Sequence, residues 1–258
     1  MEETPMFTMP TIDLSAKSLL MLAQFGFFAV FAYWGLEGAE ATSDYVFPLM
    51  MGSAGLALLF SVPNARMGVT LGIPAIMVVW GLATGENEML FWAVFMLVIV
   101  GSVAHIPALA IGDTSLGLDD DTRVKRFGLL YTFFIVFMMM MWTALPDAAM
   151  EGEITDEDSD GNETTYDLDS SQQTIAQAGL AMGVIGILVF LLTAVMGMEL
   201  GPSRPWHGGV LISGALCFDA YLWISLDTIQ STPISDILWT LAICGLITLA
   251  PCVAYENK

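Results

Sequence analysis

Long apolar runs separated by short polar segments dominate this chain. Each run has about 20 residues, the length that an α-helix needs to cross a hydrocarbon core about 30 Å thick. None of the runs alternates apolar and polar residues as a membrane β-strand would. The pattern therefore predicts an all-α, polytopic integral membrane helix bundle with eight transmembrane helices. The predicted spans are 16–37, 45–63, 67–85, 88–112, 126–147, 174–198, 208–228 and 235–255.

Composition supports this fold class and excludes several others. Hydrophobic residues make up 56% of the 258 residues and charged residues only 13%, whereas soluble domains carry about 25% charged residues. Basic residues cluster only at Arg123, Lys125 and Arg126, so we expect no nucleic-acid partner. Three cysteines lie in apolar stretches without metal-ligand spacing, and we expect neither a metal nor a cofactor.

The basic residues also predict the orientation in the membrane. With eight spans, all of them fall on one side, and cytoplasmic loops are the ones that carry an excess of Lys and Arg. We therefore expect a multi-pass protein of the cell membrane with both termini in the cytoplasm. The basic residues are Lys17, Arg66, Arg123, Lys125, Arg126, Arg204 and Lys258.

The net charge of -20 is concentrated in one predicted outer loop, residues 147–173, which holds ten carboxylates. So high a charge with few aromatic residues is typical of disorder. We therefore expect an extracytoplasmic, disordered loop, and cation binding there stays open. The acidic exterior is typical of archaeal or halophilic proteins. The loop separates residues 1–146, with four helices and a fifth span, from the three C-terminal spans in 174–258.

A weak internal duplication is visible when the two halves are compared. Spans one and five carry a Phe-Gly pair early in the helix, spans three and seven reach a Trp, and spans four and eight have a Pro near the cytoplasmic end. The order matches throughout, which favours two parallel four-helix repeats. The matching residues are Phe25-Gly26 and Phe127-Gly128, Trp80 and Trp223, and Pro107 and Pro251.

Glycines recur at intervals of three or four residues within the predicted spans. The series are Gly52 and Gly55, Gly68 and Gly72, and Gly179, Gly183 and Gly186. Small residues at this spacing let two helix backbones approach closely. We therefore expect tight helix packing at these faces.

Five polar residues inside the spans are candidates for a solute or proton pathway. Asp219, two residues before Tyr221, is predicted near the bilayer midplane, where an ionisable group costs about 2.5–3.5 kcal/mol. His105 precedes Pro107, which leaves a backbone carbonyl without its donor. Gln24 and Gln177 either line the path or bond across a helix interface. A structural hydrogen bond is the competing explanation for Asp219.

Two paired segments resemble the YaaH-type acetate and succinate uptake transporters. They are Leu49-Met50-Met51-Gly52 through Trp80, and Leu180-Ala181-Met182-Gly183 through Trp223. The chain lacks the family's Asn-Pro-Ala-Pro-Leu-Gly-Leu signature and has more predicted spans than the family's six. The resemblance implies passage of a small monocarboxylate or similar solute through a central constriction in a homo-oligomer.

These observations favour a multi-pass transporter or channel for a small solute or ion, including a small carboxylate, within the lipid bilayer. The alternative is a non-catalytic membrane subunit or scaffold of a larger complex. A membrane-embedded enzyme is least favoured, because the chain has no P-loop, His-Glu-x-x-His or Gly-x-Ser-x-Gly motif. We therefore expect no enzymatic activity.

Overall fold

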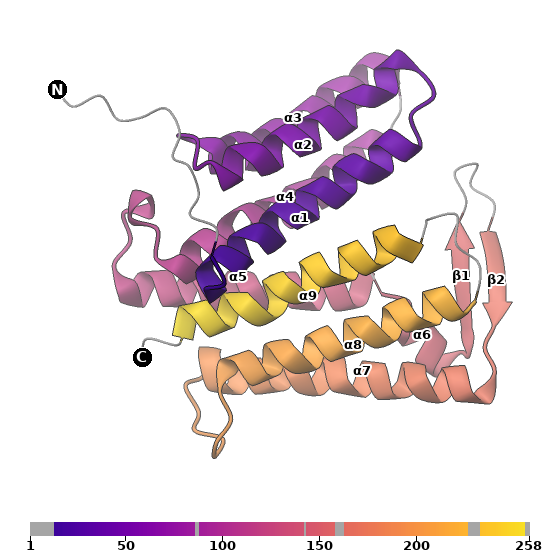
Figure 1. Cartoon of the computed structure of the whole chain (residues 1–258). Helices are drawn as coiled ribbons and strands as arrows, with labels where there is room; N and C mark the ends of the chain where they lie inside the picture. The colour runs from indigo at the N-terminus through magenta and orange to yellow at the C-terminus, as the bar shows by residue number, and fades with distance from the viewer. Residues whose placement is uncertain (1–12, 86–87, 142, 158–162, 227–232, 256–258) are drawn as a thin grey trace. The chain divides into compact units, whose positions relative to one another are not determined.

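The computed structural model describes residues 13–85, 88–141, 143–157, 163–226 and 233–255, and these residues are almost wholly helical (Figure 1). The helices are α1 (Ala16–Glu37), α2 (Val46–Leu59), α3 (Ala65–Thr84), α4 (Glu88–Ile111), α5 (Asp120–Met141), α6 (Leu145–Met150), α7 (Ser170–Phe190), α8 (Pro205–Ser225) and α9 (Pro233–Tyr255). Shorter turns are η1 (Thr42–Tyr45), η2 (Thr114–Leu116) and the π-helical η3 (Leu191–Val195). The all-α fold class is confirmed for this part of the chain.

Seven of the described helices are long and apolar enough to cross a membrane. They are α1, α3, α4, α5, α7 together with η3, α8, and α9 from Ile237. The remaining predicted span, the second (45–63), contains only one α-helix, the 14-residue α2, which is about 21 Å long. It ends early because Pro63 follows, and because Ser61 and Asn64 adopt left-handed backbone conformations that do not continue a helix.

The chain divides into two compact units within α5, the first ending at Leu130 and the second beginning at Tyr131. In the first unit, α1 packs against α2 and α3 packs against α4. The core of this unit lies along α4, where the whole stretch from Ile99 to Ala110 is buried except His105. In the second unit, α8 packs between α7 and α9, and Figure 1 shows α7 and α8 side by side along their length.

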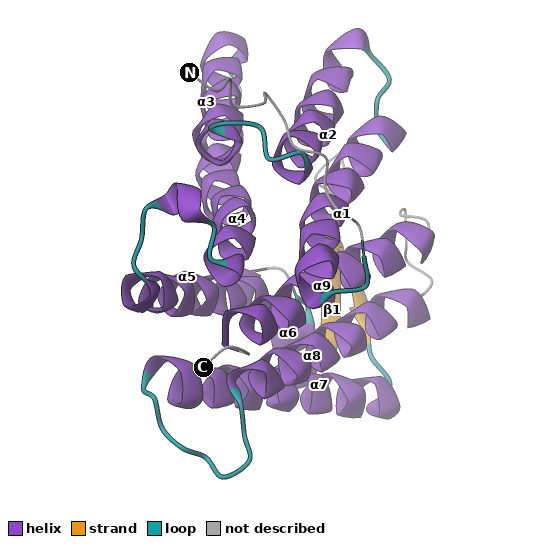
Figure 2. Cartoon of the chain, turned by 60° about the vertical axis from the view of Figure 1, so that its left-hand side comes forward, coloured by secondary structure: helices purple, strands orange, loops and turns teal. Residues whose placement is uncertain are grey.

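Part of the predicted disordered loop is ordered instead. Described residues of the segment 147–173 form α6 and an antiparallel hairpin of β1 (Glu153–Glu157) and β2 (Glu163–Asp167), drawn in orange in Figure 2. The physical reason is local. Ile154 is buried and pairs with Tyr166, and threonines face each other at the next position, which are residue types that favour strands. Asp158 and Asp160 lie outside the described residues.

Close packing is confirmed at Gly179, Gly183 and Gly186 of α7, which all face α8, although at Gly183 the nearest neighbour is Met139 of α5. At Gly68 and Gly72 the expectation was wrong, because a Cβ added there would have no neighbour within 4 Å. A Cβ added at Gly186 would lie 2.8 Å from the carbonyl oxygen of Gly208, and one added at Gly208 would lie 2.6 Å from that of Gly186. Only glycine permits so close an approach of two backbones.

Candidate functional site

Two of the predicted pathway residues hold the two ends of α6, which has six residues and follows the end of α5. The carboxylate of Asp219, on α8, accepts a hydrogen bond from the backbone N–H of Ala144 at 2.9 Å. The side-chain amide of Gln177, on α7, donates to the carbonyl of Ala149 at 3.3 Å. Helix ends leave backbone N–H and C=O groups without intrahelical partners. Asp219 and Gln177, on two neighbouring helices, therefore supply hydrogen-bond partners for backbone groups at the two ends of α6.

The position of Asp219 along α8 differs from the expected one. We expected it near the midplane of a helix covering 208–228, but α8 begins at Pro205 and ends at Ser225. Asp219 therefore lies 14 residues from one end and six from the other, or about 21 Å and about 9 Å. The carboxylate is thus near the end of the helix that α6 adjoins. Its side chain is buried, with 9% of the residue exposed.

No Lys or Arg within the described ranges forms an ion pair with Asp219. Its carboxylate is held by backbone amides, from Ala144 and from the adjacent Leu145. An unpaired ionisable side chain in a membrane-spanning helix is costly and is therefore a candidate for a functional group.

Leu145, the first residue of α6, is fully buried. A Cβ added at Gly179 of α7 would lie 3.0 Å from a terminal methyl carbon of Leu145 and 3.0 Å from the Cβ of Phe218 on α8. Leu145 therefore occupies the space that the missing side chain of Gly179 leaves beside α8. The side chain of Leu145 and the backbone bond to Asp219 fix the same end of α6.

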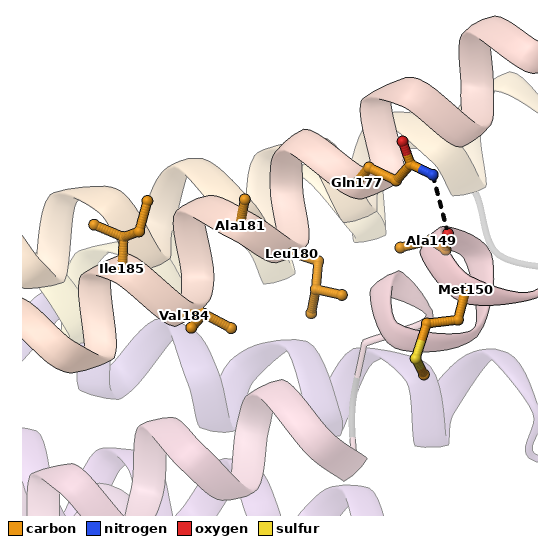
Figure 3. A pocket seen from close by; sticks show the side chains of 7 residues that line it. All are labelled: Ala149, Met150, Gln177, Leu180, Ala181, Val184 and Ile185. Atoms are coloured by element: carbon orange, nitrogen blue, oxygen red, sulfur yellow. Dashed lines mark hydrogen bonds between the residues drawn. The ribbon is translucent and has the colours of Figure 1, made fainter.

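A shallow apolar groove of about 510 Å³ lies along α6 and α7 (Figure 3). Figure 3 shows Gln177 at one end of the groove, directed toward Ala149. The groove is open rather than enclosed, so it does not form a channel through the unit. Its lining residues are Ala149, Met150, Gln177, Leu180, Ala181, Val184 and Ile185.

Gln24 has a backbone partner in the first unit. Because Pro107 has no N–H, the carbonyl of Val103, four residues earlier in α4, loses its usual donor. The side-chain amide of Gln24, on α1, donates to this carbonyl at 2.8 Å. Gln24 is itself buried. The arrangement is the bond across a helix interface that was one of the two explanations for this residue.

The second unit contains a second hydrogen bond of this kind, from a side chain to a carbonyl that a proline leaves without a donor. Its donor is a residue that the sequence-based prediction missed. Pro251 in α9 leaves the carbonyl of Ile247 without a helical donor. The hydroxyl of the fully buried Tyr131, on α5, donates to that carbonyl. The available signal was the proline itself, since a proline inside a helix implies a donor for the carbonyl four residues before it.

The remaining two candidates are Tyr221 and His105. Tyr221 is 51% exposed on the surface of α8, although it is only two residues from Asp219. His105 is half-buried on α4, in the first unit. The structure therefore brings Asp219 and Gln177 to one element, α6.

Metal-ligating side chains do not gather around α6 or elsewhere in the described ranges. Within them, no three His, Cys, Asp or Glu side chains are close enough together to hold a metal ion.

The fold and these helices define a multi-pass helical membrane protein. Comparison with protein-family models, with curated proteins and with solved structures finds no match for this chain. Its function is therefore inferred from its own residues.

Proposed function

We propose that this protein is a transporter or channel for a small solute, in which α6 acts as a gate and Asp219 controls it. The observation that carries the proposal is the buried Asp219 carboxylate, bonded to the start of α6 and unpaired with any cation among the described residues. Gln177 anchors the other end of the same short helix. The ionisable side chain of Asp219 is therefore bonded directly to α6, a helix short enough to move as a unit.

Protonation of Asp219 would weaken the hydrogen bonds that fix the start of α6. A hydrogen bond to an ionised acceptor is roughly twice as strong as one between neutral groups. Uptake of a proton by the carboxylate therefore weakens its bonds to the amides of Ala144 and Leu145. Leu145 can then leave the space beside Gly179, and α6 moves away from α7 and α8. Loss of the proton restores the closed position.

The resemblance to the acetate and succinate uptake family supplies the substrate class. A small carboxylate is the first solute to test, and passage of such a solute in that family takes place in an oligomer. Succinate is the better probe of the two, because its two charges at neutral pH keep passive leakage through the bilayer low.

An eight-span topology belongs to the same proposal. The 3₁₀ turn η1 directly precedes α2. It adds four residues at about 2 Å each, which brings the helical segment from about 21 Å to about 29 Å. This length supports a membrane-spanning role for η1 and α2 as the second of eight spans. An even number of spans places both termini on one side, the cytoplasm, and divides into two repeats of four. Pro107 with Gln24 and Pro251 with Tyr131 support the repeat in particular, because each pair joins the first and last span of one half.

A second candidate function is a non-catalytic membrane subunit. The observation in its favour is that Gln24, Gln177 and Asp219 all bond to backbone groups of neighbouring helices. Such bonds stabilise helix packing without any moving solute. In this case Asp219 would only hold α6 in place.

Flux of radiolabelled succinate into proteoliposomes distinguishes the two functions. The purified chain is reconstituted as wild type, Asp219→Asn and Asp219→Glu. We expect Asp219→Asn to reduce flux at least about tenfold, because the amide cannot take up and release a proton as the carboxyl group does. Asp219→Glu keeps an ionisable group and is expected to retain pH-dependent flux.

The matched control is Glu199→Gln, which removes one carboxylate from an exposed loop residue and should leave flux unchanged. Thermal unfolding of each variant identifies any loss of folding. Wild-type flux with a fully active, folded Asp219→Asn variant would remove Asp219 from the mechanism. Absence of wild-type flux, together with a lower unfolding temperature for Asp219→Asn, would favour the subunit function.

A further inference from the structure

Small residues of α8, four positions apart in sequence, lie against α9. A Cβ added at Gly209 would lie 2.5 Å from the carbonyl oxygen of Ile247 on α9. One turn later, the hydroxyl oxygens of Ser213 and Thr248 are 2.8 Å apart. The backbones of the two helices therefore approach closely along this face, and the next residue in the series is Cys217.

Cys244 faces this part of α8 from α9. Its thiol donates to the carbonyl oxygen of Ser213 at 3.5 Å, and the hydroxyl of Ser213 donates to the carbonyl of Cys244 at 3.3 Å. Ser213 and Cys217 lie on the same side of α8, one turn apart. In an α-helix the carbonyl of Ser213 faces the backbone N–H of Cys217, four residues later, so the thiol of Cys244 reaches α8 directly beside Cys217. Two of the three cysteines, separated by 27 residues in sequence, are therefore neighbours.

The third cysteine cannot take part. Cys252 lies eight residues after Cys244 on α9, which is about 12 Å along the helix axis. A disulfide requires Cα atoms about 4.4–6.8 Å apart. Cys217 is exposed on the surface of α8 and Cys244 is half-buried. Since α8 is one of the helices apolar enough to span a membrane, a lipid-soluble oxidant can reach Cys217.

We infer that Cys217 and Cys244 form a redox-active dithiol, which a lipid-soluble oxidant of the quinone class converts to a disulfide between α8 and α9. The two S–H bonds break and one Sγ–Sγ bond forms. The two electrons and two protons pass to the quinone, which leaves as a quinol. The disulfide clamps α8 to α9, and this site stands independently of the proposed transport function.

Thiol mapping of the purified full chain in liposomes tests the dithiol. The protein is incubated with a short-chain ubiquinone, free thiols are blocked, and the chain is denatured and reduced. Newly released thiols are then labelled with a maleimide attached to polyethylene glycol. We expect two labels on the wild type and on Cys252→Ser, and none on Cys217→Ser or Cys244→Ser.

The intact mass of the wild-type monomer gives a second readout that needs no variant. We expect it to fall by two hydrogen atoms on oxidation and to recover on reduction. The inference is overturned if the quinone leaves all three wild-type thiols free. It is equally overturned if Cys217→Ser and Cys244→Ser acquire as many labels as the wild type, or if the linked species is a dimer.

Discussion

Two prolines inside membrane-spanning helices each leave one carbonyl without its helical donor, and a side chain from another helix supplies the donor. Gln24 donates to Val103 before Pro107, and Tyr131 donates to Ile247 before Pro251. A buried carbonyl without a partner costs about 1–3 kcal/mol, and no water is available in the bilayer to replace it. The identity of these two side chains is thus tied to the prolines.

The Gln24 bond predicts a specific coupling between two substitutions. Gln24→Leu should lower the free energy of unfolding by about 1–3 kcal/mol, because Val103 loses its replacement donor. In a Pro107→Ala background the same substitution should cost much less, since the introduced alanine has an N–H that bonds to Val103 within the helix. Unfolding of the four proteins in a double-mutant cycle measures the coupling. Additive costs would show that Gln24 does not serve this carbonyl.

Also in the first unit, the ion pair of Asp113 with Arg66 predicts a pH dependence. Burial acts to raise the pKa of Asp113, but hydrogen bonds from Ser115 and Arg66, with the Arg66 charge, outweigh it and lower the pKa below 3.8. The Arg66 guanidinium and the Asp113 carboxylate are 2.6 Å apart. A carboxyl group whose pKa is lowered on folding stabilises the fold above its unfolded pKa, and this contribution disappears as the pH falls through the folded pKa.

Asp113→Asn should therefore unfold at a lower temperature than the wild type at pH 7. The difference between the two should shrink as the pH falls below about 3.8. Thermal melts across about pH 2.5–7 measure it, with Glu40→Gln, at an exposed residue, as the matched control. A difference that stays constant down to the lowest pH would show that the ionisation of Asp113 contributes nothing.

At the scale of elements, the pairing of α7 with α8 depends on glycines that meet backbone to backbone. Gly208→Ala should destabilise the protein by about 1–3 kcal/mol, the range for overpacking. The reason is that its Cβ would lie 2.6 Å from the Gly186 carbonyl oxygen and 2.9 Å from the Phe190 nitrogen.

Gly72→Ala is the matched control, because a Cβ at Gly72 has no neighbour within 4 Å. This substitution should be neutral or slightly stabilising, since alanine favours helices more than glycine does. Chemical unfolding of both variants measures the contrast. Equal stability of Gly208→Ala and the wild type would mean that α7 and α8 are not packed this closely.

Element positions could be predicted where hydrophobic content alone decides them. The apolar runs located six of the seven long helices within about four residues, because backbone groups in lipid must be satisfied within the helix itself. The fifth span was expected at 126–147, but α5 begins and ends six residues earlier. The second run failed at its end, where Pro63 and the left-handed Ser61 and Asn64 shorten α2. The β1–β2 hairpin was missed because its carboxylates indicated disorder, while pairing of Ile154 with Tyr166 depends on alternation within a short segment.

The candidate site could be predicted only in part. An ionisable residue in an apolar run identified Asp219, and Gln177 was identified by the same reasoning. Their common partner α6 was not predicted, because Ala144 is 75 residues from Asp219 in sequence and only the folded chain joins them. The place of Asp219 along its helix differs from the expected one because α8 begins and ends three residues earlier than the predicted span 208–228.

At the scale of the whole molecule, the proposed mechanism requires that the chain alone conducts a small solute. Uptake and release of a proton by Asp219 would then drive the movement of α6. The backbone hydrogen bonds of Gln24, Gln177 and Asp219 are equally compatible with a non-catalytic membrane subunit, in which they only stabilise helix packing. Flux through the purified protein is therefore the property that separates a transporter from a subunit.

The most direct test is uptake of radiolabelled succinate by liposomes that contain only the purified wild-type chain and carry an imposed pH gradient. We expect uptake that depends on the pH gradient, its reduction when a protonophore dissipates the gradient, and its loss in Asp219→Asn. Uptake by wild-type proteoliposomes equal to that of protein-free liposomes, with or without the gradient, would refute the mechanism.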